Sequence, residues 1–453
     1  MRYFTLVLAT FAGMMIGGLG LTYKVASAEP TRTTYEELTL FGDILTRVRS
    51  DYVTESEDQE LIEAAIQGML KSLDPHSSYM PPSSFEDMQV QSSGEYGGLG
   101  LEVTTRRGAV EVVTPIDDTP AARAGVEAGD FITGINGKSI LGESLNDAVD
   151  QMRGTPGSPI TITILRKGED DPLDFTIVRE VITIRSVTSR LEDDNIGYLR
   201  VSIFNENTGK LAREAIDRMK AESIGPMRGL ILDLRNNPGG LLNQAVEISG
   251  LFLDGGEVVS TRGRDPRDIE RYNARKGDQL NGLPMVVIVN AGSASASEIV
   301  AGAIQDRERG TLIGMQSFGK GSVQTVIPLN GGRDGALRLT TARYYTPSGR
   351  SIQATGITPD IEIAHRRFDK PDHSLTEADL PNALKNEIEA ARQIKADEAA
   401  ANGEEGVTNA NDDEITAEMP PEDYPEGEDY QLQRAKEILG KLVLTGHLVV
   451  TEG

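Results

Sequence analysis

Apolar positions recur at helical spacing in the first part of the chain. Thr34-Tyr35-Glu36-Glu37 is a favourable start for a helix. One face of that helix is apolar and carries Leu38, Leu40, Phe41, Ile44, Leu45 and Val48. Residues 58–73 show the same periodicity, and prolines at positions 75, 81 and 82 then interrupt it. Residues 29–90 are therefore predicted to form a polar, helical N-terminal region.

The pattern changes to short alternating segments between residues 91 and 180. The segments YGGLGLEV, AVEVVTPI, DFITGING and ITITIL predict strands separated by turns. One short helical stretch, residues 144–152, lies among them. We expect a compact β-rich module here, inserted between the N-terminal region and the rest of the chain.

Strands and helices alternate from residue 181 to residue 368. Apolar runs such as GLILDL and PMVVIVN predict buried strands, and stretches such as residues 209–221, 241–253 and 295–305 predict helices between them. The expected fold class is α/β (α+β). It comprises a core of mixed sheets with flanking helices, the inserted β-rich module and the helical N-terminal region.

Residues 369–453 are predicted to form an acidic tail. Between Ala396 and Tyr430 there are 13 acidic residues and no basic residue, a composition typical of disordered or loosely solvated chain. Residues 430–444 are amphipathic and predict a terminal docking helix. The acidic segment is therefore expected to be a solvated spacer between the core and that helix.

The charge of the chain is concentrated in this tail. The formal net charge is -25, and the 13 acidic residues of the tail segment leave -12 on the other 418 residues. An acidic protein repels phosphate backbones, so nucleic acid is a poor partner on charge grounds. The chain has no cysteine and only four histidines. Disulfides, thiolate metal sites and a cysteine nucleophile are excluded, and we expect neither a metal nor an organic cofactor.

The first 28 residues resemble an export signal. Arg2 precedes an uncharged run, residues 4–22, and the small residues Ala26-Ser27-Ala28 fit a signal-peptidase site. The run is also just long enough to span a bilayer. Residues 1–28 are therefore expected to be either a cleaved signal peptide or a retained membrane anchor. Both alternatives predict an exported protein of the periplasm, anchored to the inner membrane in the second case.

Ser295 and Glu298 stand at a predicted helix start, in the order of a capping box, and helix capping alone would explain them. Their context adds a second interpretation. A buried strand ends just before Ser295 and places a hydroxyl at a helix N-terminus, where backbone N–H groups can stabilise an oxyanion. A second buried strand ends in the turn of residues 235–240, whose glycine N–H groups could face the same place. Ser295 is thus a candidate nucleophile.

A serine nucleophile needs a base, and Lys320 is the best candidate. It follows a predicted strand and is flanked by glycines in Phe318-Gly319-Lys320-Gly321. A lysine in a low-dielectric site can lose its proton and act as a general base. The alternative is an ordinary surface lysine in a glycine-rich turn. The histidines are poorer candidates, because no evident motif pairs one with a carboxylate; His76 lies in a turn.

The motifs LRNNPGG, SASASE, FGKG and GITPD, in this order, resemble those of the carboxyl-terminal processing peptidases, also called tail-specific proteases. The resemblance covers about residues 35–365. It implies that the nucleophile is the middle serine, Ser295, rather than Ser293 or Ser297. It also implies that Lys320 is the base and that Gln324, four residues later, orients the lysine.

The same resemblance implies an oxyanion hole made of backbone N–H groups. One is that of Ala296, and the other belongs to the NPGG turn. The sequence leaves open whether Gly239 or Gly240 supplies the second donor.

The β-rich module resembles a PDZ domain. The segment YGGLGL matches the carboxylate-binding loop, and TPAARAGVEAGDFITGINGKSI is typical of bacterial PDZ modules. In such domains consecutive N–H groups bind a peptide C-terminus while the peptide adds to the sheet as a strand. The implied peptide-binding residues are Gly97, Gly98, Leu99, Gly100, Leu101 and Met152. Arg153, just after the pocket helix, is a candidate for reporting pocket occupancy to the protease core.

The resemblance implies an exported serine endopeptidase that recognises apolar C-termini of envelope proteins and cleaves them through a Ser–Lys dyad. The alternative is an exported PDZ scaffold whose protease core is resting or requires an activator, such as an adaptor protein. The apolar faces of the terminal helices predict a homo-oligomer.

Overall fold

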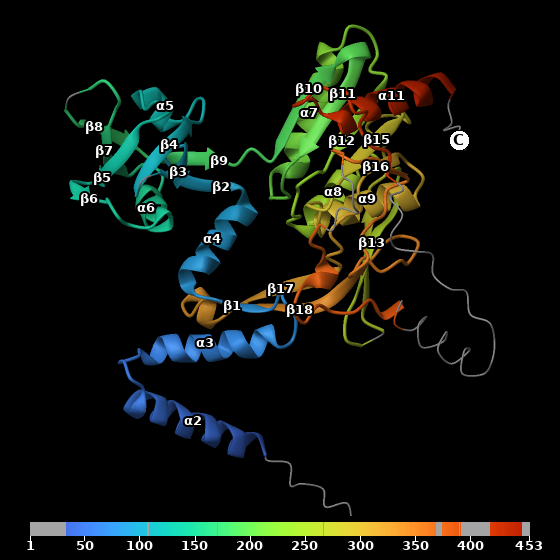
Figure 1. Cartoon of the computed structure of the whole chain (residues 1–453). Helices are drawn as coiled ribbons and strands as arrows, with labels where there is room; N and C mark the ends of the chain where they lie inside the picture. Colours follow the sequence, from blue (N-terminus) through green and yellow to red (C-terminus); the bar gives the residue numbers. More distant parts are fainter. Residues whose placement is uncertain are drawn as a thin grey trace, which may run out of the picture. The chain divides into compact units, whose positions relative to one another are not determined.

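The structure is a computed structural model that describes residues 33–106, 108–169, 171–265, 267–367, 374–388, 390 and 417–445 (Figure 1). The chain divides into two compact units between Ile66 and Gln67. Among the described residues, no helix is long and apolar enough to cross a membrane. The predicted export segment, residues 1–28, lies outside the described ranges.

The first unit contains helix α2 (Thr34–Asp51) and the start of helix α3 (Asp58–Lys71). A capping box starts α2, because Thr33 Oγ1 accepts the N–H of Glu36 while Glu36 Oε2 accepts the N–H of Thr33. No residue of α2 is buried, so its apolar face is exposed in the single chain. Both helical segments predicted here are helices.

Strand β1 (Ser78–Met80) and helix α4 (Pro82–Ser93) lead on to the β-rich module. Pro82 occupies the first turn of α4, where the missing N–H of proline costs no hydrogen bond. Helix α4 has no clear signature in the sequence and is not among the predicted helices. Its apolar residues do not follow one helical face, and only Phe85 is buried.

The β-rich module is one antiparallel sheet in the order β3-β4-β5-β7-β8, with β6 paired to β5. Its strands are Leu101–Arg106, Ala109–Pro115, Phe131–Ile135, Lys138–Ser139, Pro159–Leu165 and Leu173–Val178. Two helices accompany the sheet, α5 (Pro120–Ala124) and α6 (Leu145–Met152). Strands β2 (Glu95–Gly98) and β9 (Glu180–Thr183) pair where the chain enters and leaves the module.

The core is built on a six-stranded sheet in the order β10-β11-β12-β15-β16-β19. Its strands are Val187–Glu192, Ile196–Val201, Gly229–Asp233, Met285–Val289, Thr311–Gly314 and Ile361–Glu362. All neighbouring strands are parallel except β10 and β11. Central parallel strands are buried on both faces, which explains why β15 is apolar throughout.

Helices cover both faces of this sheet. Leu232 and Val287 face a cluster that contains helices α7 (Thr208–Glu222), α8 (Leu242–Ser249) and α9 (Ala296–Asp306). Ile231 and Ile288 belong to a second buried cluster, which contains residues of helix α11 (Tyr430–Thr445). The carboxyl end of β12 leads into the NPGG turn, and that of β15 leads into the turn that contains Ser295. Both turns therefore lie at one edge of the sheet, where open α/β sheets place their sites.

A second, antiparallel sheet has the order β1-β18-β13-β14, and β17 pairs with β18. Its longer strands are Gly256–Arg262 (β13), Ile269–Ala274 (β14), Ser322–Pro328 (β17) and Ala336–Tyr345 (β18). The pairing of β17 with β18 shifts register between Val323 and Gln324. Short 3-10 turns occur at Asp193–Asn195, Asn330–Gly332 and Glu377–Asp379.

Part of the acidic tail differs from its prediction. Residues 396–416 lie outside the described ranges, but within residues 417–429, predicted to be solvated, Glu418 and Asp429 are held by specific contacts. The N–H of Glu418 donates to the carbonyl of Glu362, and its carboxylate accepts two N–H groups of Arg434. Composition signals an acidic segment, but it cannot reveal that individual carboxylates have basic partners elsewhere.

Candidate active site

Ser295 lies in the turn between β15 and α9, in an unusual backbone conformation. Its φ is +55° and its ψ is -111°, outside the regions that non-glycine residues favour. Such strain persists only where surrounding contacts impose it, and it is concentrated at functional sites. Here the N–H of Ser295 donates to Glu298 Oε2 at 2.7 Å. The predicted capping contact is therefore present, together with a strained serine that capping alone does not require.

The three serines of the SASAS segment have different environments. Ser293 donates its hydroxyl to the carbonyl of Leu234 at 2.9 Å, and Ser297 donates to that of Asn237 at 2.8 Å. Both are fully buried. Ser295 keeps 8% exposure, and no carbonyl of the described residues accepts its hydroxyl proton. Ser293 and Ser297 fasten this segment to the neighbouring turn, which leaves Ser295 as the serine available for chemistry.

The NPGG turn brings Gly239, rather than Gly240, against Ser295. A β-carbon on Gly239 would lie 2.9 Å from Cβ of Ser295 and 3.0 Å from the nitrogen of Ala296. A β-carbon on Gly240 would instead lie 2.2 Å from the carbonyl oxygen of Phe204. Only glycine fits at either position, but only Gly239 adjoins the serine.

The N–H of Gly239 already has a partner in this structure. It donates to Oδ1 of Asn237 at 2.9 Å, and the Asn237 amide is fixed in turn by donating to the carbonyl of Val201. For the Gly239 N–H to stabilise an oxyanion, this bond has to be shared or broken. The turn is therefore close to the predicted arrangement without yet presenting its donor.

Lys320 lies in the glycine-rich loop before β17 and is half-buried. Within the described ranges its Nζ makes no hydrogen bond or ion pair. Burial and the nearby charge of Arg338 lower the pKa of Lys320, against opposing contributions from Glu377, Glu298 and Asp74. This environment favours the neutral amine that a general base requires.

Glu298 joins the turn of residues 290–295 (the serine turn) to the loop of residues 315–321 (the lysine loop). Besides the N–H of Ser295, its fully buried carboxylate accepts the hydroxyl of Ser317 at 2.6 Å and the N–H groups of Gly319 at 2.7 Å and Lys320 at 2.9 Å. Burial raises the pKa of Glu298 to about 7, although each of these bonds favours the charged form. The sequence predicts only a capping role for Glu298, because its contacts with the lysine loop cross 19 to 22 residues.

Gln324, the predicted lysine-orienting residue, makes no hydrogen bond with Lys320 among the described residues. Its amide nitrogen donates to Ser322 Oγ at 2.9 Å and to Thr340 Oγ1 at 3.2 Å. Thr340 in turn donates to Asp74 Oδ1 at 3.0 Å. Both amide protons are therefore committed to hydroxyl oxygens, and the carbonyl oxygen of Gln324 is left as the acceptor for an approaching ammonium group.

A second buried carboxylate, that of Glu377, supports the lysine loop from another side. It accepts Nε2 of His76 at 2.7 Å and the amide of Gln353 at 3.0 Å. Gln353 Oε1 accepts the N–H of Gly321 at 3.1 Å, and the N–H of Glu377 donates to the carbonyl of Phe318. The expectation that no histidine accompanies a carboxylate was wrong for His76, whose partner lies 301 residues away in the sequence.

The predicted peptide-binding residues gather around a cavity of about 200 Å³ in the β-rich module. It is lined by Gly98, Leu99, Gly100, Leu101 and Met152, together with Val103 and Val149. Gly97 lines a neighbouring cavity instead. Strand β3 is at the edge of its sheet, so one side of it is open to a further strand.

Arg153 stands beside this cavity and contacts α4. Its guanidinium forms an ion pair with Asp87 of α4 and lies 5.6 Å from the ring centroid of Tyr96. Val90 and Gln91 of α4 also line the cavity. A ligand in the cavity would therefore meet α4 as well as the module itself.

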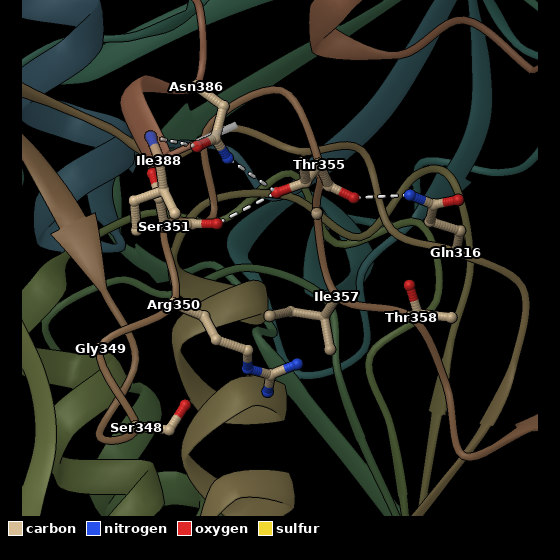
Figure 2. A pocket seen from close by; sticks show the side chains of 11 residues that line it. Gln316, Ser348, Gly349, Arg350, Ser351, Thr355, Ile357, Thr358, Asn386 and Ile388 are labelled. Atoms are coloured by element: carbon tan, nitrogen blue, oxygen red, sulfur yellow. Dashed lines mark hydrogen bonds between the residues drawn. The ribbon is translucent and has the colours of Figure 1, made fainter. Parts of the chain in front are cut away.

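A cavity of about 540 Å³ on the core is separate from these residues. Figure 2 shows its lining, in which Gln316 donates to the carbonyl of Thr355 and Asn386 donates to the Thr355 hydroxyl. Neither Ser295 nor Lys320 lines it. Over the described ranges, no group of three or more His, Asp or Glu side chains is placed to hold a metal ion.

Three protein-family models match parts of the chain. The model of peptidase family S41 matches residues 195–363, that of the PDZ domain residues 111–166, and that of the activating protease CtpB N-terminal domain residues 14–83. A carboxy-terminal-processing protease of Bartonella bacilliformis is 54% identical over 363 residues, which are 79% of this chain and 83% of that protein.

More distant relatives carry related names. Carboxy-terminal processing protease CtpA of Bacillus subtilis is 36% identical over 317 residues, which are 70% of this chain and 66% of that protein. Among solved structures, a photosystem II D1 C-terminal processing protease has 31% identity and a TM-score of 0.42, covering 74% of this chain and 94% of its own. The chain therefore belongs to peptidase family S41, as a carboxy-terminal processing protease with a PDZ domain.

Proposed function

We propose that this chain is an exported serine endopeptidase that binds apolar C-termini of envelope proteins in its PDZ domain and cleaves them with a Ser295–Lys320 dyad. One observation carries the proposal. A strained serine, whose hydroxyl proton no described carbonyl accepts, and a lysine with a lowered pKa are held by the same buried carboxylate, that of Glu298. No metal or organic cofactor takes part in the proposed reaction.

In the proposed mechanism the neutral Lys320 amine accepts the Ser295 hydroxyl proton as Oγ attacks a peptide carbonyl. The oxyanion is stabilised by the N–H of Ala296, which lies in the first turn of α9 and needs no acceptor within the helix, and by the N–H of Gly239. The lysine then gives its proton to the leaving amine. An ester between Ser295 and the acyl group remains, and water hydrolyses it by the same steps.

Several contacts support a resting form of this enzyme, which is the second candidate. No hydrogen bond joins the side chains of Ser295 and Lys320 in the described part of the chain, and Gln324 bonds elsewhere. The Gly239 N–H is held by Asn237. We infer that a ligand or an activating partner completes the site, and that the alternative function is a PDZ scaffold with a core that is inactive until then.

The proposed location of the protein is the periplasm, and its proposed assembly is a homo-oligomer. The uncharged run of residues 4–22 supports export to the periplasm, by a cleaved signal or as an inner-membrane anchor. The N-terminal helix α2 buries none of its residues in the single chain, and Leu38 and Ile44 on its apolar face are exposed, which supports self-association.

The dyad assignment predicts opposite outcomes for two neighbouring serines. Ser295→Ala should reduce cleavage of an unfolded substrate with an apolar C-terminus by at least about 10³-fold, since the nucleophile is lost. Ser297→Ala should keep most of the activity but lower the free energy of unfolding by about 1 kcal/mol, because it removes a buried hydrogen bond. Gel assays and chemical denaturation of both variants measure these effects. Cleavage by the purified Ser295→Ala protein would refute the assignment.

The pH dependence of cleavage tests the base. Activity should rise with pH as Lys320 loses its proton. Arg338→Met removes a positive charge that lowers the pKa of Lys320, so this rise should move to higher pH. Arg343→Met on the same strand is the matched control, since Arg343 pairs with Glu387 and is not among the main charges that shift the pKa of Lys320. A rise at unchanged pH in Arg338→Met would contradict Lys320 as the base.

The PDZ assignment predicts selectivity for a free carboxylate. A fluorescent peptide with an apolar C-terminus should bind at least about tenfold more tightly than its C-terminal amide, because the loop N–H groups lose a charged acceptor. Arg153→Ala should retain this binding, measured by anisotropy, and cleave tailed substrates more slowly. Equal binding of the peptide acid and the peptide amide would contradict carboxylate recognition. Unchanged cleavage by Arg153→Ala over a range of substrate concentrations would contradict the proposed role of Arg153.

A further inference from the structure

Arg235 is the hub of a buried ionic network beside the NPGG turn. Its side chain is 12% exposed, and every one of its five guanidinium N–H donors has an acceptor. Two of these acceptors are the carboxylate oxygens of Asp233, at 3.0 and 2.6 Å. Asp233 is fully buried and also accepts the hydroxyl of Tyr198.

The other three acceptors come from the C-terminal segment. Asp429 accepts Nη1 at 2.8 Å and Nη2 at 2.6 Å of Arg235, and Gln431 Oε1 accepts Nη1 at 3.1 Å. A carboxylate that accepts two parallel N–H groups of arginine fixes the guanidinium in direction as well as in position. Without this segment, three donors of a mostly buried side chain would lose their partners.

Asp429 also begins helix α11. Its Oδ1 accepts the N–H of Leu432 at 3.0 Å, which is the geometry of an N-cap. The body of α11 packs against the core sheet through Ile438 and Leu439. The docked helix therefore sets where the Asp429 carboxylate lies, and the carboxylate sets where Arg235 lies.

The backbone of Arg235 starts the turn that approaches Ser295. Its carbonyl accepts a guanidinium N–H of Arg200 at 3.1 Å. Two residues later, the carbonyl of Asn237 accepts the N–H of Ala294 at 2.9 Å, and the side chain of Asn237 holds the N–H of Gly239. A displacement of Arg235 would thus reach Gly239 through one short, hydrogen-bonded turn.

We propose that the N-terminal end of helix α11 positions the NPGG turn, with Asp429 and Arg235 as positioning residues for the Gly239 N–H. This inference rests on the proposed function, because it assigns that N–H to the oxyanion. It gives the end of the acidic tail a role in the reaction, where the sequence predicted only a solvated spacer. Its partner is a segment of the same chain, 194 residues away in sequence from the turn.

The chain offers a matched control for this pair. Arg434 of α11 forms a similar two-bond contact with Glu418, at 2.6 and 3.0 Å, which fastens the same segment without touching the turn. Asp429→Asn and Glu418→Gln each remove one negative charge from this segment and one two-bond contact. Asparagine is also a good N-cap, so Asp429→Asn leaves the start of α11 intact.

The experiment compares full-length wild type, Asp429→Asn, Glu418→Gln and Ser295→Ala. Fluorescein-labelled β-casein gives kcat and KM, diisopropyl fluorophosphate gives the rate of serine modification, and thermal unfolding gives stability. Asp429→Asn should lower kcat and the modification rate about three- to tenfold with KM within about twofold, because a misplaced donor weakens only the transition state. Glu418→Gln should keep wild-type rates, and the two variants should unfold alike.

Equal rates for Asp429→Asn and Glu418→Gln would overturn the proposal and leave the dyad untouched. Equal losses in both variants, together with lower stability, would also overturn it, since they would show a purely structural role for the segment. If Ser295→Ala still cleaved casein or reacted with the fluorophosphate at the wild-type rate, the proposed function would fail first, and the positioning role with it.

Discussion

The candidate site depends on one buried carboxylate, that of Glu298. The serine turn follows β15 and the lysine loop follows β16, the neighbouring parallel strand, so the two candidate reacting groups lie on different segments of the chain. Glu298 accepts N–H groups from Ser295, Gly319 and Lys320 and the hydroxyl of Ser317, and so fixes both segments to a single point. Four donors around two oxygens also account for the strained backbone of Ser295, because that N–H must turn toward the carboxylate.

This arrangement sets reactivity against stability. Burial raises the pKa of Glu298 to about 7, above its ordinary value of 4.5. The contribution of protonated Glu298 to the free energy of unfolding is therefore fully present below pH 4.5, and it is lost as the pH rises through about 7. Lys320 has a lowered pKa for the same reason, since burial disfavours its charge. The ionised glutamate and the neutral lysine are thus both available at neutral to alkaline pH, where the network is least favourable for folding.

Short-range patterns were sufficient to name the candidate residues. Ser295, Lys320 and the NPGG turn follow from motifs of a few residues, and helices α7, α9 and α11 follow from apolar periodicity. What joins these parts could not be predicted. Glu377 reaches His76 across 301 residues and Asp429 reaches Arg235 across 194, and single charged residues carry no local mark of a distant partner. The choice of Gly239 over Gly240 required the contact with Ser295 itself.

The most direct test of the account is the pH–rate profile of Glu298→Gln, with stability measured in parallel. A neutral glutamine offers one acceptor oxygen to four donors, so the serine turn and the lysine loop should lose their common anchor. We predict a maximal rate lower by at least about 10²-fold in a protein that still folds. If Glu298 acted only through its charge, which raises the pKa of Lys320, the profile would move to lower pH with an unchanged maximum. That result would contradict the central claim.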